Sequence, residues 1–143
     1  RLCAALAAKV AAAAPGPLDC VIAPALGGIV AGHELARALD LRSVFAEKVD
    51  GRLAMRRFAI EPGARYLVAE GVVTRGGRVQ ETIDLVRQGG GVAVAVAVLV
   101  DRSAGQADFG VPLFSLLEMA PQVWEPSECP LCKAGQPFVH PGS

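Results

Sequence analysis

The sequence predicts an α/β fold, a doubly wound and mostly parallel sheet flanked by helices. Apolar strand patterns alternate with helical patterns along the 143 residues, and this alternation is typical of βαβ units. Residues 92–100 are nearly all Val and Ala, which indicates a strand buried on both faces, as in a parallel sheet covered by helices. Several strand patterns end in loops of interest, and ligands bind at such carboxyl ends in open α/β sheets.

Apolar spacing and chain breakers define the elements. Helices are expected over residues 2–14, 29–39 and 78–88, where apolar side chains recur at helical spacing. Strands are expected over the short apolar runs 20–23, 43–47, 66–69 and 92–100. Pro15-Gly16-Pro17 follows the first helix and Gly89-Gly90-Gly91 follows the third, and both are typical stops.

The connecting segments are less regular. Residues 48–57 are charged and contain Gly51, and we interpret them as an exposed, mobile excursion. Residues 70–77 are expected to form a loop, and residues 111–117 fit either an edge strand or a turn of helix. The Pro- and Gly-rich tail from Pro121 is expected to wrap the surface. We expect residues 1–143 to form one domain, with 121–143 as its C-terminal tail.

Bulk composition restricts the partners. Fourteen Lys and Arg residues balance fourteen Asp and Glu residues, so no overall field attracts nucleic acid or anionic lipid. The longest apolar run, 92–100, is shorter than the roughly 20 residues of a membrane-spanning helix. Neither nucleic acid nor membrane is therefore expected as a partner, and a cytoplasmic location is the default. Because the chain starts at Arg1, we expect a trimmed sequence with a segment missing in front.

The cysteines offer one alternative function. Cys129 and Cys132 form a lone CxxC, and a zinc site needs about four ligands. His140 could add one ligand, whereas Cys3 is remote in sequence. A tight turn with reduced thiols is favoured over a metal or a redox disulfide, and Cys20 is expected to be a buried strand thiol.

Residues 70–78 have the composition of a phosphate-binding loop. An apolar strand leads into Glu70, then Thr74, then Gly76-Gly77, then a helix. Glycines let backbone N–H groups approach an anion closely, and the helix adds its N-terminal N–H groups and positive dipole end. Glu70 can accept hydrogen bonds from sugar hydroxyls. An ordinary strand-to-helix turn remains the alternative; neither the P-loop nor the dinucleotide motif is present.

A second glycine-containing loop follows the first strand. Pro24-Ala25-Leu26-Gly27-Gly28 joins it to a helix, and by itself would be a simple turn. Two such loops at neighbouring strand ends could instead grip two separated phosphates of one ligand.

Taken together, these motifs resemble a known family. The resemblance is carried also by Phe45-Ala46-Glu47-Lys48, Val100-Asp101-Arg102-Ser103, residues 107–112 and Glu128-Cys129-Pro130-Leu131-Cys132. Residues 19–143 look like the shorter bacterial and archaeal orotate phosphoribosyltransferases, of the type I phosphoribosyltransferase family. The resemblance implies the type I fold, phosphoribosyl pyrophosphate (PRPP) and orotate as substrates, Mg²⁺ as cofactor and a homodimer. Orotate would displace pyrophosphate, giving orotidine monophosphate in pyrimidine biosynthesis.

The resemblance also assigns residues. The implied PRPP-binding residues are Ala25, Leu26, Gly27, Gly28, Lys48, Glu70, Gly71, Val72, Val73, Thr74, Arg75, Gly76, Gly77 and Arg78. Thr74 and Arg102 would contact orotate, since a guanidinium can form paired hydrogen bonds to carboxylate oxygens. Lys48 and Glu70 would be catalytic, and no side chain is assigned as a metal ligand. Arg52, Arg56 and Arg57 would close with Lys48 over pyrophosphate, across the dimer; a solvated basic face is the alternative.

Three positions depart from the family pattern. Gly71 stands where the family has a second acid, and Arg75 and Arg78 stand where small residues are usual. The arginines could assist a phosphate or fill its pocket. A PRPP-sensing regulator of the same fold and a purine-base phosphoribosyltransferase are therefore kept as alternatives.

Overall fold

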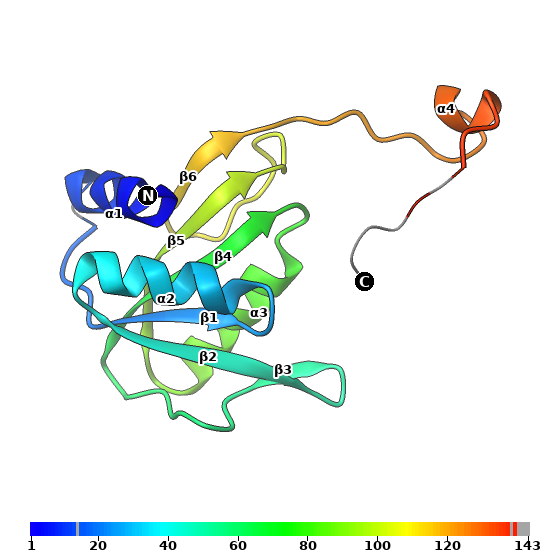
Figure 1. Ribbon diagram of the computed structural model, residues 1–143. Helices are drawn as coiled ribbons and strands as arrows, with labels where there is room; N and C mark the ends of the chain where they lie inside the picture. Colours follow the sequence, from blue (N-terminus) through cyan, green and yellow to red (C-terminus); the bar gives the residue numbers. More distant parts are fainter. Residues whose placement is uncertain (14, 138, 140–143) are drawn as a thin grey trace.

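A six-stranded sheet forms the centre of the computed structural model, which describes residues 1–13, 15–137 and 139 (Figure 1). The strands are β1 (Cys20–Pro24), β2 (Arg42–Val49), β3 (Arg52–Ala54), β4 (Arg65–Val73), β5 (Val92–Asp101) and β6 (Leu113–Glu118). The helices are α1 (Leu2–Ala13), α2 (Gly28–Leu39), α3 (Gly77–Gln88) and the short α4 (Pro130–Lys133).

The strand order is β3-β2-β1-β4-β5-β6. All neighbouring pairs run parallel except β2 and β3, which form an antiparallel hairpin. The order reverses at β1, whose neighbours β2 and β4 both follow it in the chain. This topology confirms the predicted doubly wound sheet, and ligands bind at the carboxyl ends beside such a reversal.

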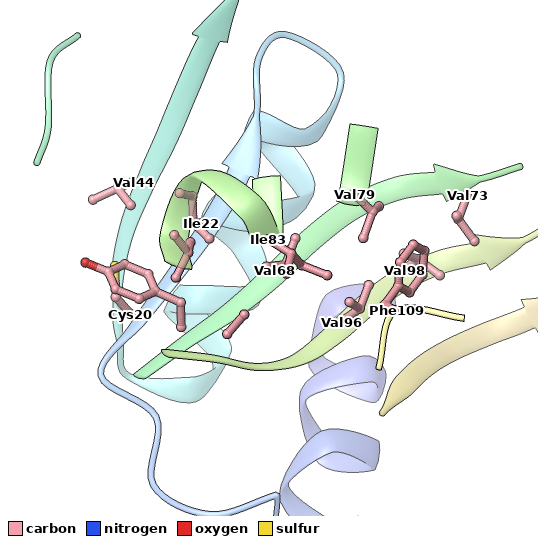
Figure 2. Packing of buried hydrophobic residues seen from close by; sticks show 13 residues of the cluster. Cys20, Ile22, Val44, Val68, Val73, Val79, Ile83, Val96, Val98 and Phe109 are labelled. Atoms are coloured by element: carbon pink, nitrogen blue, oxygen red, sulfur yellow. The ribbon is translucent and has the colours of Figure 1, made fainter. Parts of the chain in front are cut away.

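Helices cover both faces of the sheet. Helices α1 and α2 pack on one face, where their buried side chains meet Val21, Leu67 and Ala95. Helix α3 packs on the other face through Val79, Ile83 and Val86. Figure 2 shows Val79 and Ile83 of α3 beside Ile22, Val68, Val96 and Val98 of the central strands. Alternate residues of each central strand thus point to opposite layers, as the pleat requires.

Small residues let α2 lie close to the sheet. A Cβ atom added at Gly32 would lie 2.8 Å from the Cβ of Ala23 on β1, which is closer than two carbon atoms can approach without a shift. The beginning of α2 is thereby held directly over the end of β1.

Two boundary predictions were wrong. Strand β4 continues to Val73 instead of ending at Ala69, so Glu70 lies within the strand and the loop begins only at Thr74. The β-branched residues Val72 and Val73 extend the ladder, pairing with Val100 and Asp101.

The other wrong boundary is the end of the second strand, which lies within the segment predicted as an exposed, mobile excursion. Strand β2 continues to Val49 and returns as β3, through a two-residue turn whose Asp50 and Gly51 have φ of 48° and 87°. Asp-Gly with both φ angles positive is the preferred connection of a tight hairpin.

The C-terminal part resolves one alternative and contradicts one prediction. Residues 113–118 form the edge strand β6, so the strand interpretation of 111–117 was right. The segment after it leads away from the sheet and does not wrap the surface (Figure 1), and Val123 is 86% exposed. Its prolines cannot donate ladder hydrogen bonds, and its described residues add no further strand.

None of the helices among the described residues has the length and apolar character needed to cross a membrane.

Candidate active site

A hollow of about 510 Å³ opens where β4 leads into α3. Its lining residues are Glu70, Val72, Val73, Thr74, Arg75, Gly76, Gly77, Arg78, Val79 and Glu81. All residues of the 70–78 motif except Gly71 therefore line one cavity. Arg75 and Arg78 form part of its wall.

Gly76 gives the hollow its shape. Its φ of 76° lies in the left-handed region, which glycine adopts without strain. A Cβ atom there would lie 2.7 Å from Cε1 of Phe109, a buried ring. The backbone thus passes directly over the ring and turns into α3, whose start carries no side-chain cap. The first N–H groups of α3, which have no acceptor within the helix, are free to bind an anion.

Glu70 lies between the two glycine-containing loops. Its Oε1 accepts a hydrogen bond of 2.8 Å from the Gly71 N–H. The same oxygen is 3.2 Å from the position of a Cβ atom at Gly28, at the beginning of α2. Burial raises the pKa of the Glu70 carboxyl, while the Gly71 hydrogen bond and the charge of Arg78 oppose that rise. A half-buried carboxylate therefore lines the hollow and lies close to the beginning of α2.

The loop from Ala25 to Gly28 is tied to the neighbouring strand. The Ala25 N–H donates to the carbonyl of Ala46 at 2.7 Å, and the Ile29 N–H donates to that of Leu26 at 3.1 Å. The Ala25–Leu26 peptide is cis, and Leu26 is 83% exposed. Gly27 is the N-cap residue of α2 and makes no side-chain cap hydrogen bond. The loop does not line the hollow, but it meets the hollow at Glu70, so two uncapped helix starts flank one carboxylate.

The structure places Thr74 and Arg102 at the ends of the adjacent strands β4 and β5. Val73, next to Thr74, pairs with Asp101, next to Arg102. The Arg102 N–H donates to the Val73 carbonyl at 2.8 Å. The Asp101 carboxylate accepts the Ser103 N–H at 2.7 Å and so shapes the turn at the end of β5. Both Thr74 and Arg102 are exposed at this edge.

The β2–β3 hairpin is joined to the hollow by a residue that sequence reasoning missed. Glu81 of α3 accepts the Leu53 N–H at 2.7 Å through Oε1 and pairs with Arg78 at 2.8 Å through Oε2. Lys48 is exposed and stands opposite Leu53 in the hairpin register. The signal available in the sequence was the Arg78–Glu81 spacing of three residues at a helix start.

The charged residues after the hairpin fold back onto β2. Arg57 pairs with Glu47 at 3.2 Å, and Phe58 packs edge-on against Phe45 with ring centroids 5.1 Å apart. Arg52 and Arg56 are exposed.

The cysteines lie in separate parts of the molecule. Cys20 is buried in β1, as expected, and burial raises its pKa to about 11. Cys3 lies on α1 against the core. Cys129 and Cys132 lie in the tail around α4, and His140 lies outside the described residues.

No family model matches the chain. Comparison with curated proteins finds relatives that share one name, orotate phosphoribosyltransferase. The orotate phosphoribosyltransferase of Heliobacterium modesticaldum is 52% identical over 126 residues, covering 87% of this chain and 66% of that protein. The orotate phosphoribosyltransferase of Pelotomaculum thermopropionicum is 47% identical over 143 residues, covering 99% of this chain and 74% of that protein. The chain thus spans about two thirds of the length of most of these relatives.

Solved structures share the architecture. Adenine phosphoribosyltransferase from Thermoanaerobacter pseudethanolicus has a TM-score of 0.67 at 21% identity, covering 80% of this chain and 79% of that one. Orotate phosphoribosyltransferase from Aeropyrum pernix has a TM-score of 0.63 at 23% identity, covering 82% and 70%. The fold is that of a type I phosphoribosyltransferase. Within that class, sequence identity near one half over most of its length places the chain in the orotate phosphoribosyltransferase family.

Proposed function

We propose that this protein transfers the phosphoribosyl group of PRPP to orotate, giving orotidine monophosphate and pyrophosphate in pyrimidine nucleotide synthesis. The observation that carries the proposal is the hollow lined by residues 72–78 and Glu70, with a second uncapped helix start beside the same carboxylate. PRPP carries a phosphate and a pyrophosphate on opposite ends of a ribose. Two anion-binding helix starts separated by a hydroxyl acceptor match that order.

Each part of the ligand then has a counterpart. The backbone N–H groups from Thr74 to Arg78 bind the 5′-phosphate, and Glu70 accepts hydrogen bonds from the ribose hydroxyls. The Ala25–Gly28 loop binds pyrophosphate through its N–H groups. Arg102, held at the end of β4 by its hydrogen bond to Val73, presents its guanidinium to the orotate carboxylate beside Thr74.

Catalysis in this arrangement is positioning together with charge stabilisation. The bond from the anomeric carbon to pyrophosphate breaks as the orotate nitrogen forms its own, through an oxocarbenium-like sugar. Lys48 stabilises the departing pyrophosphate, and the site holds both reactants in line.

Magnesium is proposed as the cofactor, and the donor set fits an ion carried mainly by the substrate. Among residues 1–13, 15–137 and 139, no group of three or more His, Cys, Asp or Glu side chains could hold a metal. Mg²⁺ ordinarily takes one or two carboxylates and completes its octahedron with phosphate oxygens and waters. Glu70 is the carboxylate in place to join such a set. The ion would neutralise charge on the leaving pyrophosphate.

Homodimerisation and a cytoplasmic location belong to the same proposal. In this account the arginines at 52, 56 and 57 serve the partner's site, since they lie on or just after the edge strand β3, while Lys48 serves the site of its own chain.

Gly71→Asp is expected to bind PRPP about ten-fold more tightly, because a second carboxylate would accept a ribose hydroxyl in a charge-assisted hydrogen bond. A Cβ atom at Gly71 meets no atom within 4 Å, and its φ is not left-handed, so the side chain has room. Calorimetric titration with PRPP and Mg²⁺ measures the change.

Gly71→Asn and Gly71→Ala are the matched controls for that titration. The neutral amide should gain less than the carboxylate, and alanine should gain nothing. Equal affinities in wild type and Gly71→Asp would contradict the assigned position of the ribose, and absence of saturable PRPP binding in wild type would contradict the proposed function.

A further inference from the structure

Both oxygens of the Glu81 carboxylate are engaged, with two different parts of the site. Oε1 accepts the backbone N–H of Leu53 at 2.7 Å, across 28 residues of sequence, and Oε2 accepts Nη1 of Arg78 at 2.8 Å. The Glu81 side chain is 33% exposed. Glu81 also lines the hollow, so one side chain connects the hairpin, the helix and the cavity.

The hairpin depends on such a connection. Strand β3 is an edge strand of three residues that pairs only with β2. An isolated edge has unpaired N–H groups and little to fix it. Leu53 is 7% exposed, so its N–H needs an acceptor within the protein, and Glu81 supplies a charged one, which gives a stronger hydrogen bond than a neutral partner.

The hairpin register links this bond to Lys48. Lys48 stands directly opposite Leu53, and directly opposed residues lie on the same face of a strand pair. Holding the Leu53 backbone against α3 therefore fixes the direction in which Lys48 leaves the hairpin. On the other side, Arg78 uses one of its five donors for Glu81 and keeps the remaining ones for a ligand.

We propose that Glu81 is a positioning residue that sets the Lys48 hairpin and the Arg78 guanidinium in fixed relation to each other. This inference rests on the proposed function, because it assigns Lys48 to the leaving pyrophosphate and Arg78 to the 5′-phosphate. Glu81 touches neither reacting atom. It acts by holding the two cationic side chains at the two ends of the substrate.

Two substitutions separate the two bonds. Glu81→Gln keeps an oxygen acceptor for the Leu53 N–H but removes the charge that pairs with Arg78. Glu81→Ala removes both. Glu34→Ala is the matched control, because Glu34 and Arg37 form a similar three-residue-spaced pair at 2.8 Å on α2, and Glu34 has no backbone partner among the residues that the structure describes.

Amide hydrogen exchange at Leu53 tests the anchoring without any need for turnover. We expect exchange to accelerate by about ten-fold or more in Glu81→Ala, to stay within about three-fold of wild type in Glu81→Gln, and to be unchanged in Glu34→Ala. Unchanged exchange at Leu53 in Glu81→Ala would overturn the inference, whatever the activity.

Steady-state kinetics test the consequence for the site. Glu81→Ala should lower kcat by about ten-fold or more, because Lys48 is no longer held. Glu81→Gln should keep kcat within about three-fold while the KM for PRPP rises by about three- to ten-fold, because Arg78 alone is released. If Glu81 mattered for folding alone, its substitution would reduce the fraction of active enzyme. The apparent kcat would then fall while the KM for PRPP stayed unchanged, so the split between kcat and KM would not be seen.

The outcomes distinguish the inference from the proposed function. Faster Leu53 exchange in Glu81→Ala with unchanged kcat and KM would overturn the positioning role. Wild-type protein that turns over no PRPP would overturn the proposed function, and the exchange data would then still decide whether Glu81 anchors the hairpin.

Discussion

Gly76→Ala is expected to abolish phosphate binding at the hollow and to lower the free energy of unfolding by about 3 kcal/mol. Two independent effects add. An alanine at φ of 76° is strained, and its Cβ would lie 2.7 Å from Cε1 and 2.8 Å from Cζ of the buried Phe109 ring. The ring cannot retreat without disturbing the core cluster that contains Val73 and Val79. The loop must therefore shift, and the N–H groups at the beginning of α3 shift with it.

Two glycine controls separate these effects in denaturant unfolding. Gly63 has a similar φ of 78° but no atom within 4 Å of an added Cβ, so Gly63→Ala measures backbone strain alone. Gly77 has no left-handed φ and no atom within 4 Å of an added Cβ. Gly77→Ala should therefore leave the free energy of unfolding within about 1 kcal/mol of wild type. If Gly76→Ala were no less stable than Gly63→Ala, the contact with Phe109 would not be what fixes the loop.

Glu70→Gln is expected to lower PRPP affinity by about 100-fold while making the fold more stable at neutral pH. The affinity falls because a charged acceptor for the ribose hydroxyls is replaced by a neutral one. The fold gains because burial raises the pKa of this carboxyl, so keeping it ionised opposes folding. Glutamine retains an oxygen that can accept the Gly71 N–H.

The sign of the stability change in Glu70→Gln can be tested through its dependence on pH. A carboxyl whose pKa is raised on folding favours the folded state below its unfolded value, about 4.3, and loses that contribution as pH rises through its folded value. The gain in melting temperature of Glu70→Gln over wild type should therefore be present at pH 7 and vanish at about pH 4.

Glu34→Gln is the control with the opposite sign, because its hydrogen bond with Arg37 lowers the pKa of the exposed Glu34 carboxyl. That substitution should give no gain at pH 7. If Glu70→Gln melted at or below the wild-type temperature at pH 7 and its deficit persisted at pH 4, burial would not be the main influence on the Glu70 carboxyl.

The sequence predicted the sheet and the glycine-containing turn into α3 because both depend on local pattern. The Val- and Ala-rich run of β5 and the glycines at 76–77 allow few other structures. The end of β4 was missed because Gly71 suggested a loop, whereas pairing of Val72 with β5 extends the strand through it. This pairing is a tertiary effect that local composition does not contain.

The β2–β3 hairpin and the contact made by Glu81 were missed in the sequence for two different reasons. Asp50-Gly51 is a strong hairpin signal, and it was outweighed by the charge of residues 48–57. The bond between Glu81 and Leu53 joins segments 28 residues apart, and nothing in either segment specifies the other. The proximity of Glu70 to Gly28 has the same origin, since β1 and β4 become neighbours only when the sheet forms.

The most direct test of the central claim is the release of pyrophosphate from PRPP and Mg²⁺ by this chain, with orotate, adenine or no base added. We expect release that requires orotate and forms orotidine monophosphate in equal amount, with adenine giving no more than the reaction without base. Release driven by adenine, or PRPP binding with no release under any base, would contradict it.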